Sequence, residues 1–250
     1  MPIPDLEDVR ALRQDKYGGD PNADLTEDFA RLAKDEPLAY VIGWIPFLGL
    51  RIHLDTRPLI PRPETEWWTE KLIAHLHKKF GDEPFTLLDL CAGSGAVGLS
   101  VLNSFPRAHV SFGELVLEHA SLIRKSLEVN DLDPARADIR TGDLFAPFGA
   151  NRFNIIATNP PYVPQARKLP RSVTDYEPAE ALYAGEDGLE LIRHIGQEAG
   201  ARLFADGELW MECDVENISE AKRLIESAGA KAELCTDPYG RARLLVSYYS

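Results

Sequence analysis

Four consecutive residues, Asn159, Pro160, Pro161 and Tyr162, bring together an amide, two prolines and an aromatic ring. Proline lacks an N–H group and has a fixed φ, so two prolines after a strand predict a stiff, open loop. Asn159 Oδ1 and the Pro160 carbonyl offer acceptors for the two N–H groups of a planar amine or amide, and Tyr162 offers a ring for stacking. These groups suit methylation of a planar nitrogen, a poor nucleophile that must be held in place. A strand-ending turn with an aromatic plug is the plainer interpretation.

A turn of small residues lies earlier in the chain: Cys91, Ala92, Gly93, Ser94 and Gly95. It follows an apolar run at 85–90, typical of a buried strand, and precedes a helical pattern at 96–105. A strand, a tight turn and a helix N-terminus form a cradle for a nucleotide, and Gly93 and Gly95 let the backbone approach a ligand. Because Cys91 replaces the first glycine of the dinucleotide fingerprint, the pattern is closer to sites for S-adenosylmethionine.

Two further strand ends carry candidate ligand contacts. Glu114 ends the predicted strand 109–113 and is placed to accept hydrogen bonds from ribose hydroxyls. Asp143 and Leu144 follow the predicted strand 138–141, where an acid and an apolar residue can flank an adenine ring. A solvated acid at a strand end and an ordinary turn residue are the alternatives for Glu114 and Asp143.

The elements that must position these residues alternate between strands and helices. Further strands are predicted at 153–158, 207–213, 231–236 and 242–249, and helices at 118–130, 192–203 and 218–228. A turn at 237–240 predicts that the last two strands form an antiparallel hairpin. This order is typical of an α/β, doubly wound, mostly parallel seven-stranded sheet. The Asn159 loop is then expected at the carboxyl end of a strand, facing the small-residue turn.

The chain is expected to divide into three parts. Residues 1–36 are predicted to be a short helical segment, 37–64 a β-hairpin and linker, and 65–250 the main domain. Within the main domain, the long polar loop 163–188 is expected to act as a lid or a binding surface.

Composition and charge indicate which classes of partner and which compartment to expect. The net charge is −13, which argues against direct nucleic-acid binding, because that binding rests on phosphate neutralisation by Lys and Arg. No apolar run approaches a membrane span, and the N-terminus has neither a secretory signal nor a transit peptide, so we expect a cytoplasmic monomer rather than a membrane or mitochondrial protein. Three cysteines in apolar contexts indicate a reducing compartment, and none has metal-site spacing.

Several motifs occur together in one order. They are 60–66 (Ile-Pro-Arg-Pro-Glu-Thr-Glu), 89–95, 159–163 (Asn-Pro-Pro-Tyr-Val), 176–178 (Tyr-Glu-Pro) and 188–189 (Gly-Leu). The set resembles the HemK-type protein-glutamine N5-methyltransferases, which modify peptide chain release factors and have a Rossmann-like methyltransferase fold. The proline-rich motif at 60–66 is the more specific part, because Asn-Pro-Pro-Tyr also occurs in adenine-N6 methyltransferases. Taken alone, 60–66 also reads as a well-capped helix N-terminus.

The resemblance implies transfer of a methyl group from S-adenosylmethionine to the glutamine of a Gly-Gly-Gln motif in a release factor. It implies that the methyl donor is bound by Cys91, Ala92, Gly93, Ser94, Gly95, Glu114, Leu144 and Asn159. The glutamine would be held by Asn159, Pro160, Pro161 and Tyr162, with Asn159, Pro160 and Tyr162 as the catalytic residues. The N-terminal helical domain of the family docks the release factor, and here only about 36 residues precede the shared region.

Two other functions remain open from the sequence. Adenine-N6 methylation of RNA or DNA uses the same Asn159 loop on a flipped base and requires a basic channel. A non-catalytic binding module that has kept the fold would not bind the methyl donor.

Overall fold

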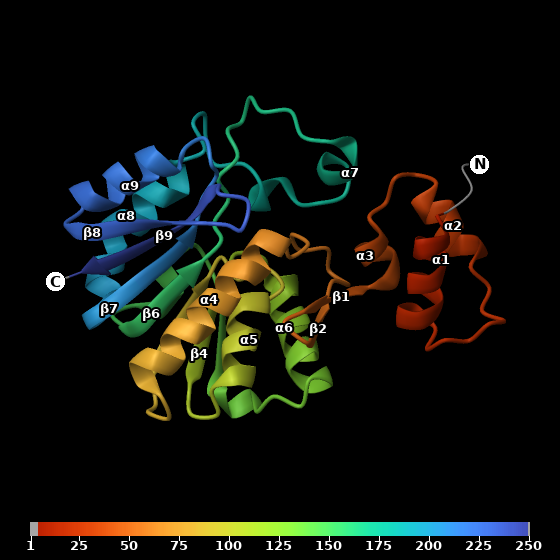
Figure 1. The fold of residues 1–250 in the computed structure, drawn as a ribbon, viewed down its shortest axis with the longest axis horizontal. Coiled ribbons are helices and arrows are strands. Elements are labelled where there is room, and N and C mark those ends of the chain that lie inside the picture. The colour runs from red at the N-terminus through yellow and green to blue at the C-terminus, as the bar shows by residue number, and fades with distance from the viewer. Residues whose placement is uncertain (1–4, 250) are drawn as a thin grey trace.

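A seven-stranded sheet forms the centre of the computed structural model, which describes residues 5–249 (Figure 1). Its order is β5-β4-β3-β6-β7-β9-β8. The pairs β7–β9 and β8–β9 are antiparallel and the other four pairs are parallel. The strands are β3 (Thr86–Leu90), β4 (His109–Glu114), β5 (Ala137–Thr141), β6 (Phe153–Thr158), β7 (Leu203–Glu212), β8 (Ala230–Thr236) and β9 (Ala242–Tyr249). The predicted α/β sheet with an antiparallel C-terminal hairpin is confirmed.

Helices cover both faces of this sheet, each through its apolar side. Trp68, Leu99 and Ile123 are fully buried in one core cluster, whereas Ile195 and Ile225 are buried in a second cluster. The first cluster lies under α4 (Pro63–Phe80), α5 (Ala96–Ser104) and α6 (Leu117–Val129), and the second lies under α8 (Glu190–Arg202) and α9 (Ile218–Ser227). The chain is thus doubly wound.

The sheet order reverses between β3 and β6. The chain runs outward from β3 through β4 to β5 and then returns to place β6 on the other side of β3. Leu90 pairs with Thr158 at the carboxyl ends of these two strands, so the Cys91 turn and the Asn159 loop begin side by side. This reversal is where open α/β sheets bind ligands.

The N-terminal segment is helical, and its helices continue beyond residue 36, where the predicted helical segment ends. The two predicted helices are present as α1 (Leu6–Ala11), which continues as a π-helical turn over Leu12–Lys16, and α2 (Thr26–Leu32). A third helix, α3 (Leu38–Ile42), lies inside the predicted hairpin region, because Pro37 suits a helix start and Gly43, with φ 93°, ends it. Leu12, Leu25 and Val41 form a small core of their own. The division of the chain at 36 and 64 stays a prediction.

The hairpin follows α3 as β1 (Trp44–Phe47) and β2 (Leu50–His53). Side chains of α6 and of Asn130, the residue that caps its end, bind N–H groups on the free edge of β2. Asn130 Oδ1 accepts from the Arg51 N–H at 2.9 Å, and Ser126 Oγ accepts from the His53 N–H at 3.0 Å. These bonds fasten the hairpin to the main sheet domain.

The long segment 163–188 is folded back on itself. Val163 forms a bridge with Tyr183, and between them lie α7 (Arg171–Thr174) and a 3-10 turn at Ala179–Ala181. Other 3-10 turns occupy Pro134–Arg136 and Ala146–Phe148. None of the helices described within residues 5–249 is both long enough and apolar enough to cross a membrane.

Candidate active site

The turn after β3 is a run of left-handed backbone. Cys91, Gly93 and Gly95 have φ values of 58°, 54° and 78°. Glycine adopts this region freely, whereas a side chain there is strained. Ala92 N–H donates to the Gly113 carbonyl at 3.0 Å and ties the turn to the end of β4. The turn leads directly into the N-terminus of α5, whose first residue is Ala96.

Glu114 lies at the carboxyl end of β4 and is 6% exposed. Its carboxylate accepts from the N–H groups of Gly93 at 2.6 Å and Val116 at 3.0 Å, and His119 Nδ1 lies 3.2 Å from Oε1. Burial by itself raises the pKa of Glu114, but these hydrogen bonds outweigh it and hold the pKa below its ordinary value. Glu114 is therefore an ionised acceptor at neutral pH.

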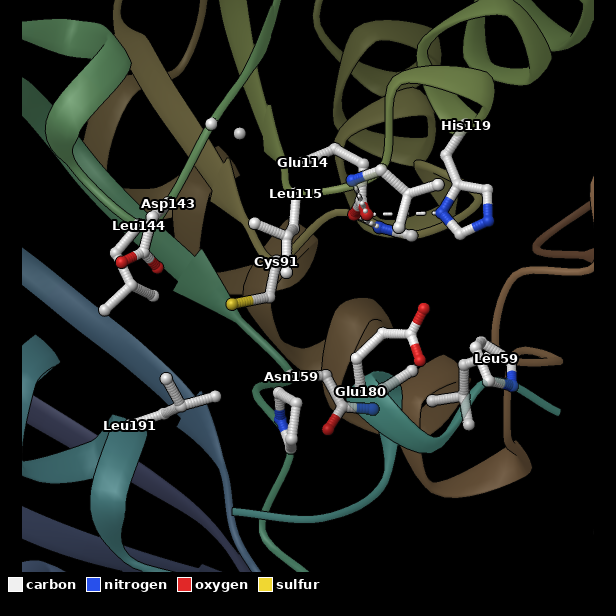
Figure 2. A pocket seen from close by; sticks show the side chains of 17 residues that line it. Leu59, Cys91, Glu114, Leu115, His119, Asp143, Leu144, Asn159, Glu180 and Leu191 are labelled. Atoms are coloured by element: carbon white, nitrogen blue, oxygen red, sulfur yellow. Dashed lines mark hydrogen bonds and ion pairs between the residues drawn. The ribbon is translucent and has the colours of Figure 1, made fainter. Parts of the chain in front are cut away.

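A cleft opens at the reversal point of the sheet and contains about 700 Å³ of space, part of it open to solvent (Figure 2). We call it the main cleft. Cys91 and Gly93 line it together with Glu114, while Leu144 and Leu191 give it apolar walls. Its other lining residues are Leu59, Gly113, Leu115, Val116, His119, Gly142, Asp143, Asn159, Pro161, Pro178, Glu180 and Ala181.

The loop after β6 is anchored at both ends. Asn159 Nδ2 donates to Thr65 Oγ1 at 3.1 Å, and the Tyr162 hydroxyl donates to Glu212 Oε1 at 2.9 Å. Burial and the neighbouring Glu212 charge raise the pKa of Tyr162 well above its ordinary value, so the phenol stays protonated. Pro160 and Pro161 are buried, whereas Asn159 is half-buried. The loop is rigid, and its Asn159 side remains accessible.

Asn159 lies where two cavities meet. It lines the main cleft and also a second cavity of about 640 Å³, which we call the outer pocket. The outer pocket is lined by Leu59, Arg62, Asn159, Pro160, Tyr162, Val163, Arg167, Leu169, Val173, Ala181, Leu182 and Asp214. The loop faces the small-residue crevice from one side and this second cavity from the other.

The structure gathers most of the predicted site residues around this junction. Cys91, Gly93, Glu114, Leu144 and Asn159 line the main cleft. Ala92 and Ser94 line a smaller cavity that adjoins it and shares several of its lining residues. Pro161 faces the main cleft, and Pro160 and Tyr162 face the outer pocket.

Gly95 is the exception among the predicted contacts, because it lines none of these three cavities. A Cβ on Gly95 would lie 2.9 Å from a side-chain carbon of Ile123. Its lack of a side chain thus lets α6 pack closely against the turn, and direct contact of Gly95 with a ligand stays a prediction.

A buried clamp holds the 163–188 segment against the proline-rich loop before α4. Glu177, 5% exposed, accepts from the Ile60 N–H at 3.0 Å and from Arg62 at 2.6 Å. This clamp fixes two walls of the outer pocket relative to each other. Within residues 5–249, no group of three or more His, Cys, Asp or Glu side chains is arranged to hold a metal ion.

Comparison with known proteins identifies the family. Residues 66–175 match the family described as "Methyltransferase small domain". The release factor glutamine methyltransferase of Deinococcus radiodurans is 34% identical over 232 residues, which cover 92% of this chain and 81% of the relative. That of Thermodesulfovibrio yellowstonii is 36% identical over 220 residues, which cover 86% and 77%. The chain belongs to the release factor glutamine methyltransferase family.

Solved structures support the fold of this release factor glutamine methyltransferase family member. A methyltransferase from Pyrococcus furiosus matches with a TM-score of 0.58 at 16% identity, over 90% of this chain and 98% of that one. The 16S rRNA N2 G1207 methyltransferase of T. thermophilus, solved with AdoMet and guanosine, matches with a TM-score of 0.60 at 21% identity, over 83% and 50%. The Rossmann-like methyltransferase fold and the family resemblance are both confirmed.

Several residues at the site of this family member were not singled out from the sequence. His119 supports Glu114, and Leu59 lines both cavities. Thr65 and Glu212 bond to the Asn159 loop. Glu212 is an acid at the carboxyl end of β7, as Glu114 is at the end of β4. The same argument that predicted a role for Glu114 could therefore have pointed to Glu212 from the sequence.

Proposed function

We propose that this protein transfers a methyl group from S-adenosylmethionine to the side-chain amide nitrogen, N5, of the glutamine in a Gly-Gly-Gln motif of a peptide chain release factor. The observation that carries this proposal is the position of Asn159 between the main cleft and the outer pocket, in a chain of this family. A donor on one side and an amide on the other would meet at that residue.

The residues of the main cleft fit S-adenosylmethionine. The ionised Glu114 carboxylate suits ribose hydroxyls, the apolar side chains of Leu144 and Leu191 suit a purine ring, and the turn at 91–95 leads into a helix N-terminus. We assign the donor to Cys91, Gly93, Glu114, Leu144 and Asn159, with Ala92 and Ser94 at its edge. The bound donor supplies an electrophilic methyl group on a positively charged sulfur.

The Asn159 loop supplies what the acceptor needs. An amide nitrogen is a poor nucleophile, so its two N–H groups must be held while positive charge develops on it. Asn159 Oδ1 and the Pro160 carbonyl are the two proposed acceptors, and no backbone N–H among residues 5–249 donates to that carbonyl. Methyl transfer would leave the electron pair of the broken bond on the donor sulfur and release one amide proton to water, while Asn159 Oδ1 and the Pro160 carbonyl hold the amide nitrogen. Tyr162, held by Glu212, packs beside the flat amide.

The release factor itself would lie over the outer pocket and the N-terminal helices. The Tyr176 hydroxyl donates to the Lys34 carbonyl, so the segment 163–188 and the N-terminal segment meet beside that pocket. Removal of residues 1–36 is then expected to raise the KM for the release factor about tenfold, equivalent to about 1.4 kcal/mol, with kcat little changed. An unchanged KM would exclude this docking role. Because release factors act in translation, we propose a cytoplasmic location.

The relatives do not favour the adenine-N6 alternative. The decisive experiment incubates the protein with methyl-labelled S-adenosylmethionine and a release factor, and repeats the reaction with the motif glutamine changed to alanine. Mass spectrometry is expected to find one added methyl group on that glutamine alone. Equal labelling of both release factors, or labelling of RNA instead, would reject the proposal.

A further inference from the structure

Glu212 is buried beneath the Asn159 loop, and the proposed reaction gives it no role beyond holding Tyr162. It ends β7, is 1% exposed, and forms no ion pair within 4 Å among residues 5–249. Burial raises its pKa above the ordinary value. Burial of a carboxyl group costs desolvation free energy, so a buried acid next to an active site is a candidate for a functional role.

Glu212 binds three side chains from two separate parts of the chain. Its Oε2 accepts from Thr65 Oγ1 at 2.7 Å and from Trp68 Nε1 at 2.6 Å, both on the first turns of α4. Its Oε1 accepts from the Tyr162 hydroxyl at 2.9 Å. The same carboxyl group therefore holds the end of the Asn159 loop and, through Thr65, its beginning.

The donor directions in this chain of bonds are fixed by chemistry. The indole N–H of Trp68 can only donate, so Glu212 Oε2 is an acceptor. Where the carboxyl group is ionised or carries its proton on Oε1, Oε2 has no hydrogen, so the Thr65 hydroxyl donates its single hydrogen to Oε2 and only its lone pairs remain for Asn159. A lone pair accepts from Nδ2 and not from Oδ1, so the amide of Asn159 is oriented with Oδ1 away from Thr65.

We propose that Glu212 is a positioning residue that sets the amide orientation of Asn159 through Thr65. This inference rests on the proposed function, in which Oδ1 accepts an N–H from the substrate amide. Without Glu212, the Thr65 hydroxyl is free to donate to Oδ1, and Asn159 can turn its NH2 group toward the substrate. Two N–H donors would then face each other, and the acceptor would be lost.

Kinetics test the proposal with two matched pairs of variants. Glu212→Met and Thr65→Val break the chain of bonds. Thr65→Ser keeps the hydroxyl, and Glu212→Gln keeps one oxygen to accept from Thr65 and Trp68, while its NH2 group faces the Tyr162 hydroxyl. We expect kcat to fall about a hundredfold in Glu212→Met and Thr65→Val, as for a misplaced reacting group. It should stay within about threefold in Glu212→Gln and Thr65→Ser, because the bond between residues 65 and 212 remains. Calorimetry should give the same Kd for S-adenosylmethionine throughout. The double variant Thr65→Val with Glu212→Met should be no slower than its slower single variant, because the residues act as one unit.

Glu208 provides the control for a purely structural effect. It is a buried acid on the same strand, 3% exposed, and bonds to Lys79 and Trp210 far from the Asn159 loop. Glu208→Gln is expected to lower the melting temperature without changing kcat. A kcat for Glu212→Met within twofold of wild type, or a loss matched by Glu208→Gln, overturns the proposal. If Glu212→Met does not fold, equal kcat values for Thr65→Val and Thr65→Ser overturn it instead.

A second readout does not depend on activity. In protein labelled with 15N asparagine and free of ligand, the side-chain NH2 signal of Asn159 is identified by its loss in Asn159→Ala. We expect that signal to shift and its hydrogen exchange to accelerate in Thr65→Val, but not in Thr65→Ser or Glu208→Gln. An unchanged signal in Thr65→Val overturns the inference even if the enzyme methylates release factors. A shifted signal in a protein that labels no release factor would instead reject only the proposed function.

Discussion

At the scale of a single residue, Asn159 is the proposed contact between the enzyme and the substrate amide. Its side chain is half-buried, bonded on one side to Thr65, and placed between the main cleft and the outer pocket. A short amide held in this way offers one oxygen at a fixed point, which a flexible or charged side chain would not do. The role proposed for the residue is therefore to orient the substrate amide rather than to react with it.

Asn159→Ala is expected to lower kcat about 100-fold to 1,000-fold, comparable to the loss of one preorganised hydrogen-bonding group at a reacting atom. Binding of S-adenosylmethionine should be retained, because the other contacts of the main cleft remain. Single-turnover methylation of the release factor measures the first quantity and calorimetry the second. Asn151→Ala, in the exposed loop before β6, is the control. Unchanged turnover in Asn159→Ala would remove the assigned role.

Cys91 shows how backbone geometry acts at a single position. Its φ of 58° is one that glycine favours and that costs other residues about 1–2 kcal/mol. Cys91→Gly is therefore expected to be more stable than Cys91→Ala by about 1 kcal/mol, the reverse of the usual order. Urea unfolding of the two variants compares them directly. If the alanine variant is the more stable, the left-handed backbone at residue 91 does not destabilise the protein.

The same cysteine is not a nucleophile that competes for the methyl group. Burial raises the pKa of its thiol to about 12, with the Glu114 charge adding to the shift. The thiolate is then rare at neutral pH, and it is the thiolate that reacts. Cys91 thus serves the cleft as a small, inert wall.

At the scale of elements, the clamp between Glu177 and the proline-rich loop is the feature that shapes the outer pocket. The buried carboxylate joins a segment near residue 177 to Ile60 and Arg62, far apart in the chain. Because Arg62 is partly exposed, the ion pair contributes less than a fully buried one would. The clamp nevertheless gives the 163–188 segment one defined position.

Glu177→Ala is expected to release this segment and to destabilise it by about 1–2 kcal/mol, since a buried hydrogen-bonded acceptor is removed. Limited trypsin digestion should then cut faster at Arg167 and Lys168. Asp175→Ala, which breaks an exposed pair with Arg171, is the matched control and should digest like wild type. Identical digestion of both variants would mean that the clamp does not restrain the segment.

The elements also show what sequence can and cannot predict. Strand β6 occupies the predicted range 153–158, because prolines end it and buried apolar residues fill it. Helix α3 was not predicted. Its five residues are too few for the spacing of apolar residues to distinguish a helix from a strand. The bond between Thr65 and Glu212 joins residues that lie far apart in sequence, and no local pattern reports such a pairing.

At the scale of the whole molecule, Asp89 couples stability to pH. It is 2% exposed on β3, and burial raises its pKa to about 8, although the Gly98 N–H bond partly opposes this. In the unfolded chain an aspartate titrates near 3.9. Between these values the folded protein keeps a proton that the unfolded chain has lost. The contribution of Asp89 to stability therefore falls as pH rises through this range and levels off above about pH 8.

Asp89→Asn should remove this slope, because an amide does not titrate. Urea unfolding at pH 6 and pH 8 is expected to show a larger loss of stability in wild type than in the variant, with an upper limit of about 1.4 kcal/mol per pH unit for one proton. The exposed Asp82→Asn controls for the loss of one charge. Parallel pH dependence in wild type and Asp89→Asn would show that Asp89 is ionised in the folded protein.

Gly188 lies far from the Asn159 loop in sequence but packs directly against its end. A Cβ at this buried position would lie 2.3 Å from the Tyr162 carbonyl oxygen, which Asn217 also contacts, and its φ of 74° is left-handed. Any side chain there has to push the loop away from the junction of the two cavities. In a library with all twenty residues at position 188, selected for methylation, we expect almost only glycine to survive, although Gly188 lines neither the main cleft nor the outer pocket.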